Sequence, residues 1–144
     1  MTVETDAQPQ RPLSVRQDIG IVIAEDDPGH YVLARNCLRS AGITNEILWF
    51  EDGQAVLDFF SKLDRKGGRY ILLLDIRMPK VDGMKVLETI KKDPVLRDIP
   101  VIMLTTSEDQ ELAKHCYDLG CEAHIIKPPG KVLLKAIERL SQTI

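Results

Sequence analysis

The sequence lacks any apolar run approaching the ~18 residues that a membrane-spanning helix needs. It also lacks an excess of basic residues, since its net charge is −3 and its pI about 5.6. The charge balance therefore does not indicate binding to nucleic acid. The first residues contain no apolar stretch of the kind that marks a secretory signal. We therefore expect a cytoplasmic protein that binds neither a membrane nor nucleic acid.

Cysteine is scarce, and its spacing excludes two kinds of site. The three cysteines, Cys37, Cys116 and Cys121, form neither a C-x-x-C pair nor a Cys/His metal-ligand pattern. An odd number of cysteines without a secretory signal indicates reduced thiols. Because free cysteines are commonly buried, we interpret all three as small core residues.

The length of 144 residues predicts a single domain. Residues 1–18 mix polar, charged and proline residues without periodicity, which is typical of a disordered or loosely docked tail. The predicted domain therefore spans residues 19–144.

Within this domain, five apolar runs alternate with five segments of helical periodicity. The runs are 19–24, 46–50, 70–75, 100–104 and 123–126, and the helical segments are 28–41, 53–63, 83–92, 108–119 and 131–141. This alternation predicts an α/β fold with a doubly wound, five-stranded parallel sheet and helices on both faces. A flavodoxin-like strand order, 2-1-3-4-5, fits five such units.

Polar or charged residues stand at the ends of four of these strands. They are Glu25-Asp26, Asp75, Thr105 and Lys127. Parallel strands deliver their carboxyl ends to one edge of the sheet, so these side chains should converge. Three carboxylates near one lysine leave surplus negative charge, and Mg²⁺ with oxygen ligands is its natural counter-ion.

Such a pocket can perform phosphoryl chemistry. With Mg²⁺ bound, Asp75 could attack phosphorus as a carboxylate nucleophile and form an aspartyl phosphate. Lys127 and the metal would neutralise the phosphoryl oxygens, and the Thr105 hydroxyl could hydrogen-bond one of them. Each residue alone also fits a helix cap or a solvated turn, so the prediction depends on their conjunction.

The chain resembles a response-regulator receiver domain of two-component signalling over residues 19 to about 142. The resemblance lies in residues 21–27 (IVIAEDD), 73–83 (LLDIRMPKVDG) and 100–105 (PVIMLT), and in Lys127-Pro128. It implies that Asp75 accepts a phosphoryl group from a phosphohistidine on a sensor histidine kinase or a histidine phosphotransfer protein. The domain would catalyse this phosphorylation itself, and autodephosphorylation is left open.

The resemblance also assigns a metal site. Asp26 and Asp75 would bind Mg²⁺ directly, the Arg77 backbone carbonyl would be a further ligand, and Glu25 would act mainly through water. No other cofactor is expected.

The remaining roles concern the conformational switch. Thr105 is the switch hydroxyl and Lys127 the phosphate partner, and the Lys127–Pro128 bond is usually cis in the family. His124 stands where the family usually carries Tyr or Phe as a switch aromatic, so it either takes part in switching or only fills space.

The chain ends after the fifth helix, which predicts a single-domain regulator that signals by altering partner binding or dimerisation. Residues 91–100 further resemble the small regulators paired with phytochrome-type kinases. Whether the protein is a homodimer stays open at this point.

Three other functions are compatible with parts of this pattern. A haloacid-dehalogenase-type phosphatase needs a second Asp two residues after the nucleophile, where Arg77 stands. A flavin- or nucleotide-binding protein needs a Gly-rich loop after the first strand, where residues 25–27 would repel phosphate. A degenerate receiver that acts as a phosphorylation-independent interaction module is the remaining alternative, although Asp75 and its partners are intact.

Overall fold

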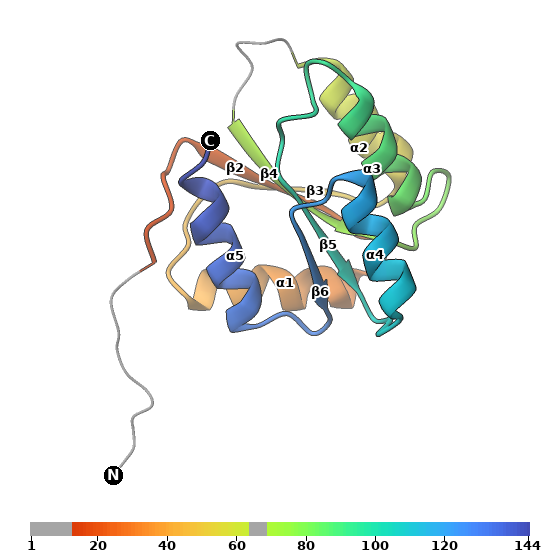
Figure 1. Ribbon diagram of the computed structural model, residues 1–144. Coiled ribbons are helices and arrows are strands. Elements are labelled where there is room, and N and C mark those ends of the chain that lie inside the picture. Colours follow the sequence, from red (N-terminus) through yellow and green to blue (C-terminus); the bar gives the residue numbers. More distant parts are fainter. Residues whose placement is uncertain (1–12, 64–68) are drawn as a thin grey trace.

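A computed structural model describes residues 13–63 and 69–144. They contain a parallel five-stranded sheet in the order β3-β2-β4-β5-β6, which corresponds to the predicted order 2-1-3-4-5 (Figure 1). The strands are β2 (Ile19–Ala24), β3 (Ile47–Phe50), β4 (Arg69–Asp75), β5 (Val101–Thr105) and β6 (Ala123–Ile126). The helices are α1 (Pro28–Ser40), α2 (Gly53–Ser61), α3 (Gly83–Lys92), α4 (Gln110–Leu119) and α5 (Lys131–Ser141).

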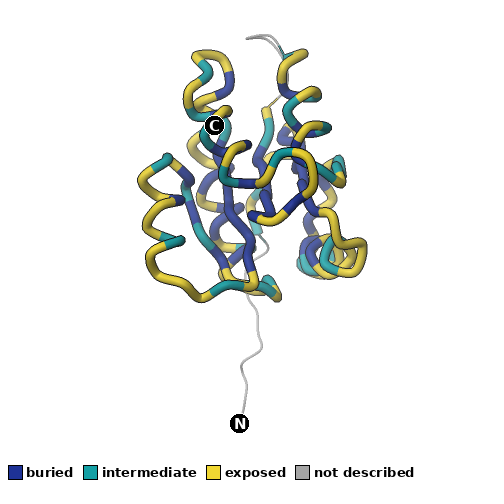
Figure 2. Tube along the Cα trace, turned by 90° about the vertical axis from the view of Figure 1, so that its right-hand side faces the viewer, coloured by how far each residue is buried: buried dark blue, intermediate teal, exposed yellow. Residues whose placement is uncertain are grey.

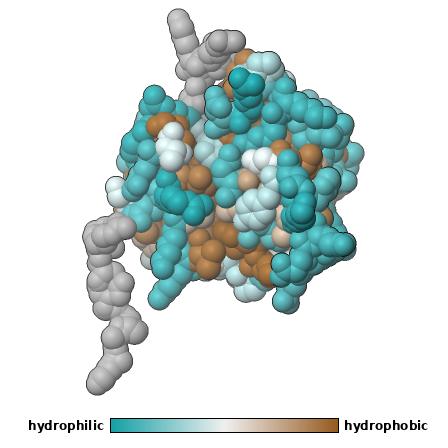
Figure 3. All heavy atoms as spheres, in the orientation of Figure 1, coloured by the Kyte–Doolittle hydropathy of each residue, from teal (hydrophilic) through white to brown (hydrophobic). Residues whose placement is uncertain are grey.

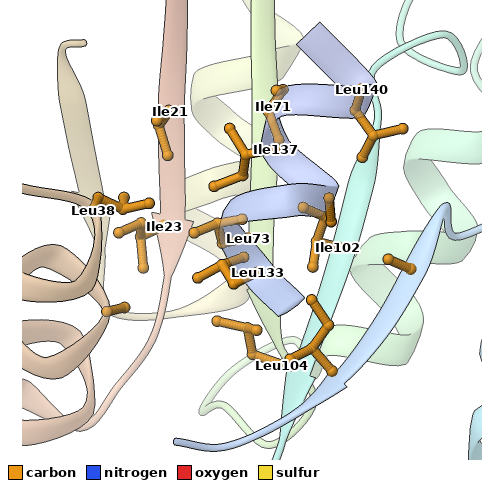
Figure 4. Close-up of a cluster of buried hydrophobic side chains, with 14 of the residues drawn as sticks. Ile21, Ile23, Leu38, Ile71, Leu73, Ile102, Leu104, Leu133, Ile137 and Leu140 are labelled. Atoms are coloured by element: carbon orange, nitrogen blue, oxygen red, sulfur yellow. The ribbon is translucent and has the colours of Figure 1, made fainter. Parts of the chain in front are cut away.

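The sheet separates two hydrophobic cores, because successive side chains of a strand point to opposite faces. In β4, Ile71 and Leu73 face α1 and α5, whereas Leu72 and Leu74 face α2, α3 and α4. Figure 4 shows the first of these cores, in which α5 lies over the central strands. The central strands are buried between helices whose outer faces are exposed (Figure 2). Both faces of the sheet are therefore covered, as the continuous apolar strands predicted.

Aspartates set the starts of several helices. Asp27 caps α1 by accepting hydrogen bonds from the backbone N–H groups of Gly29 and His30, at 2.8 and 3.1 Å. The fourth helix was predicted from residue 108 but begins at Gln110, because Asp109 is its N-cap. The prediction was early by two residues for this reason.

The segment before the first strand makes specific contacts. Leu13 and Val15 pack against the core on the α5 side of the sheet. The Ser14 backbone N–H donates to Glu138 at 2.7 Å, and the Arg16 guanidinium donates to the Ile144 carbonyl at 2.8 Å. Residues 13–18 thus lie against the end of α5, while the rest of the predicted tail lies outside the described residues.

The surface is consistent with the composition. Hydrophilic residues cover most of the face seen in Figure 3, with apolar residues gathered in a few patches. None of the helices in the described ranges is long and apolar enough to cross a bilayer. Cys116 and Cys121 are buried and Cys37 is half-buried, all three as free thiols, and burial raises the pKa of Cys121 to about 12.

Candidate functional site

The carboxyl ends of the strands bring three acidic side chains together. Glu25 and Asp26 follow β2, and Asp75 is the last residue of β4. One carboxylate oxygen from each lies within 4.8 Å of the others. They open onto a pocket of about 210 Å³, whose further lining residues are Asp27, His30, Arg77, Thr105, Thr106 and Lys127. The predicted convergence at one edge of the sheet is therefore present.

A close turn behind Asp75 fixes its backbone. The Gly83 N–H donates to the Ile76 carbonyl at 2.6 Å, so α3 begins directly against the end of β4. A Cβ atom on Gly83 would lie only 2.1 Å from the Asp75 carbonyl oxygen. Glycine is thus required for this approach, which explains the Asp82-Gly83 pair seen in the sequence.

Lys127 provides the cation of the site. Its side chain is 8% exposed, and its ammonium forms an ion pair with Glu25 and lies 3.3 Å from Asp75 Oδ1. The bond between Lys127 and Pro128 is cis, as the resemblance implied. A phosphoryl group on Asp75 would therefore be within reach of a fixed positive charge.

The electrostatics of the pocket favour a bound cation. Burial raises the pKa of Glu25, the charge of Asp75 raises it further, and the hydrogen bond with Lys127 opposes this shift. Three carboxylates against one lysine leave net negative charge in a pocket where Glu25 is buried, Asp75 is nearly so and Asp26 is exposed. Oxygen ligands of this kind are those that Mg²⁺ prefers, so the donor set fits that ion.

Thr105 and Arg77 line the same pocket. Thr105 Oγ1 accepts a hydrogen bond from the Ser107 backbone N–H at 3.0 Å, and its own hydroxyl hydrogen can be donated to a further acceptor. Arg77 has an exposed side chain just beyond the end of β4. All predicted site residues except His124 therefore meet here.

His124 lies elsewhere, on the α4–β6–α5 side of the molecule. It lines a separate pocket of about 560 Å³ with Tyr117, whose hydroxyl accepts a hydrogen bond from the His124 backbone N–H at 3.1 Å. Its Nε2 atom is buried, and the described residues offer it no hydrogen-bond partner. Burial lowers the pKa of the His124 imidazole. Its part in switching stays a prediction.

This burial predicts a pH dependence of stability. The folded state holds the pKa of His124 below its ordinary value of 6.5, so the unfolded chain binds the proton more tightly. The contribution to stability is therefore present above pH 6.5 and is lost as the pH falls through the folded-state pKa. We expect His124→Phe to lose less stability than wild type between about pH 7.5 and about pH 5 in urea unfolding. Equal losses in the two proteins would contradict this.

Two residues near the pocket were not predicted from the sequence. His30 was not assigned a role, yet its Nδ1 lies 3.2 Å from Lys127 Nζ. Trp49 donates its indole N–H to the Glu25 carbonyl at 2.8 Å and stacks on Tyr31 at a centroid distance of 4.1 Å. One feature of the sequence could have indicated His30, namely its position in the first turn of a helix that starts beside Glu25 and Asp26.

The fold and site define a doubly wound α/β protein with an acidic pocket at the carboxyl edge of its sheet. Residues 21–138 match the response regulator receiver domain family. The chain belongs to that family.

Individual relatives agree with this assignment. The chain is 40% identical over 111 residues to a probable methanogenesis regulatory protein, FilR2, of Methanothrix harundinacea, covering 75% of this chain and 71% of the relative. It is 32% identical over 126 residues to response regulator Rcp1 of Synechocystis, covering 82% of this chain and 83% of the relative. A Mn²⁺-bound structure of Rcp1 superposes with a TM-score of 0.69 at 29% identity, covering 85% of this chain and 91% of that one. The bacteriophytochrome response regulator AtBRR gives a TM-score of 0.73 at 35% identity, covering 84% of this chain and 91% of that one. The chain is therefore similar to response regulators associated with phytochromes.

Proposed function

We propose that this receiver domain accepts a phosphoryl group on Asp75 from a phosphohistidine, carried by a sensor histidine kinase or a histidine phosphotransfer protein, in a Mg²⁺-dependent reaction. The observation that carries the proposal is the position of Asp75, 3.3 Å from a buried lysine and beside two further carboxylates. This arrangement supplies a nucleophile and a fixed cation at one point of the pocket.

The metal site fits the residues present. Asp26, Asp75 and the Arg77 carbonyl would hold the ion, and Glu25 would act through water. When bound, Mg²⁺ would offset the negative charge of the phosphoryl oxygens. The Mn²⁺-bound form of the relative Rcp1 supports a divalent cation in this proposal.

The protein side chains account for the transfer itself. A carboxylate oxygen of Asp75 forms a bond to phosphorus as the phosphorus–nitrogen bond of the donor breaks, and the electron pair of that bond stays on the imidazole nitrogen. Lys127 donates to one phosphoryl oxygen and Thr105 to another. In this proposal the output is a change around Thr105 and His124 that alters partner binding or dimerisation, in the cytoplasm and without nucleic acid.

The metal requirement provides the test. Wild-type protein incubated with acetyl phosphate and Mg²⁺ should gain one phosphoryl group by intact mass, and it should gain none in excess EDTA. We expect Asp26→Asn to weaken Mg²⁺ binding by at least about tenfold, since one unit charge close to a divalent ion is worth several kcal/mol. Binding can be followed through the fluorescence of Trp49, the single tryptophan, whose indole N–H donates to the backbone carbonyl of Glu25.

A matched control uses an aspartate outside the pocket. Asp98 is exposed in the segment after α3, and Asp98→Asn should bind Mg²⁺ as wild type does. Metal-independent labelling, or equal Mg²⁺ affinity in Asp26→Asn and Asp98→Asn, would count against the proposed site. Labelling that is absent from wild type even with a phosphohistidine donor would favour the interaction-module alternative.

A further inference from the structure

His30 occupies an unusual place for a side chain that the proposed transfer does not use. It is the third residue of α1, and its backbone N–H is bound by the Asp27 cap at 3.1 Å. Its side chain is 38% exposed, so filling the core is not its main role. Yet its Nδ1 atom lies 3.2 Å from the Lys127 ammonium, a residue 97 positions away in the chain. The first turn of α1 thus reaches the cation of the pocket.

The contact with Lys127 assigns a role to one ring nitrogen. An ammonium carries only hydrogen-bond donors, so Nδ1 is the acceptor in this contact. The carboxylates of Glu25 and Asp27 lie farther away, each 3.9 Å from a ring nitrogen, Glu25 from Nδ1 and Asp27 from Nε2. The Lys127 ammonium is therefore the nearest of these charged groups to the His30 ring.

This contact adds an imidazole to the partners of the lysine. In the described part of the chain, the Lys127 ammonium is hydrogen-bonded to Glu25, contacts His30 Nδ1 at hydrogen-bond distance, and forms an ion pair with Asp75 at 3.3 Å. Glu25 and Asp75 are shared with the proposed metal site, and Asp75 changes its charge when it is phosphorylated. Of these three partners of Lys127, His30 is the one that brings no carboxylate to the pocket and takes no part in the proposed chemistry.

We propose that His30 is a positioning residue, which holds the Lys127 ammonium at the place where it meets the incoming phosphoryl group. This inference rests on the proposed function. An imidazole is suited to the task because it can restrain the ammonium without adding another carboxylate to the pocket. His30 therefore acts on the rate of transfer through Lys127 and leaves metal binding alone.

A pair of nearly isosteric variants tests the acceptor. His30→Asn keeps a polar δ1 atom that can accept from Lys127, whereas His30→Leu places a methyl group there. At saturating Mg²⁺ we expect His30→Leu to lower the rate of phosphoryl uptake from acetyl phosphate about tenfold, as for the loss of one charge-assisted hydrogen bond, and His30→Asn to stay within about threefold of wild type. The Mg²⁺ affinity, read from Trp49 fluorescence, should be unchanged in both variants. Wild-type rates in both variants, or equal loss of rate and of Mg²⁺ affinity in both, would overturn the inference.

A metal-free measurement separates this inference from the proposed function. In urea unfolding without Mg²⁺, His30→Leu should reduce stability when Lys127 is present and have no such effect in a Lys127→Met background. Equal effects in the two backgrounds would show that His30 and Lys127 are not coupled, and would reject the positioning role. If wild type takes up no phosphoryl group, the proposed function fails, and this cycle still decides whether the contact exists.

Discussion

Asp75→Asn is expected to take up no phosphoryl group from acetyl phosphate and Mg²⁺, whereas wild type gains one. The amide lacks the ionised oxygen that attacks phosphorus. The other carboxylates of the pocket, Glu25, Asp26 and Asp27, follow a different strand from Asp75, and Glu25 is already ion-paired with Lys127. We therefore expect none of them to accept the phosphoryl group in place of Asp75. Intact-mass measurement after short incubation gives the result directly.

The fold should survive this substitution. Asp75 is one of three carboxylates crowded within 4.8 Å, so removing its charge relieves repulsion in the metal-free protein. We expect Asp75→Asn to unfold at the same or a higher urea concentration than wild type. The matched variant Asp98→Asn, with an exposed side chain, should be labelled like wild type. Labelling of Asp75→Asn at the wild-type level would remove Asp75 from its proposed role.

Lys127→Met is expected to produce the second large effect, a loss of about 3 kcal/mol or more in the stability of the metal-free protein. The side chains of Lys127 and Glu25 are only 8% and 4% exposed, so removing the ammonium leaves carboxylates buried without their cation. The free energy of unfolding in urea with EDTA measures this loss. Because Mg²⁺ can replace the missing positive charge, its addition should stabilise Lys127→Met more than it stabilises wild type.

An exposed lysine provides the control. Lys114 pairs with Asp118 at 2.8 Å on the surface of α4, with side chains 77% and 60% exposed. Lys114→Met should therefore have little effect on stability, and Mg²⁺ should stabilise it as much as it stabilises wild type. Similar losses in the two variants would show that burial of the Lys127 ion pair does not contribute as we describe.

The sequence predicted the fold because its strongest signals are local and repeated. Apolar strands that end in Asp75 and Thr105 alternate with helices that start at capping aspartates, and right-handed crossovers then leave few topologies. The meeting of Glu25, Asp75 and Lys127 follows from that topology alone, since parallel strands end at a common edge.

Side-chain directions across elements could not be read in the same way. The contact between His30 and Lys127 depends on how the first turn of α1 is oriented over the strand ends, which periodicity does not specify. The contacts of residues 13–18 depend on the end of α5, more than a hundred positions away, and their composition gave no sign of them. The sequence places His124 near the start of the last strand. It does not show that the side chain lies apart from the acidic pocket, in a pocket lined by residues of α4 and α5.

The central claim is that Asp75 carries the phosphoryl group, and mapping the modification tests it most directly. Borohydride reduction of an aspartyl phosphate gives homoserine, and trypsin cleaves after Arg69 and Arg77 to release the peptide 70–77, in which Asp75 is the sole acidic residue. Wild-type protein treated with acetyl phosphate, Mg²⁺ and then borohydride should yield this peptide with homoserine at position 75. An unmodified 70–77 peptide, recovered from protein that had gained a phosphoryl group, would contradict the account.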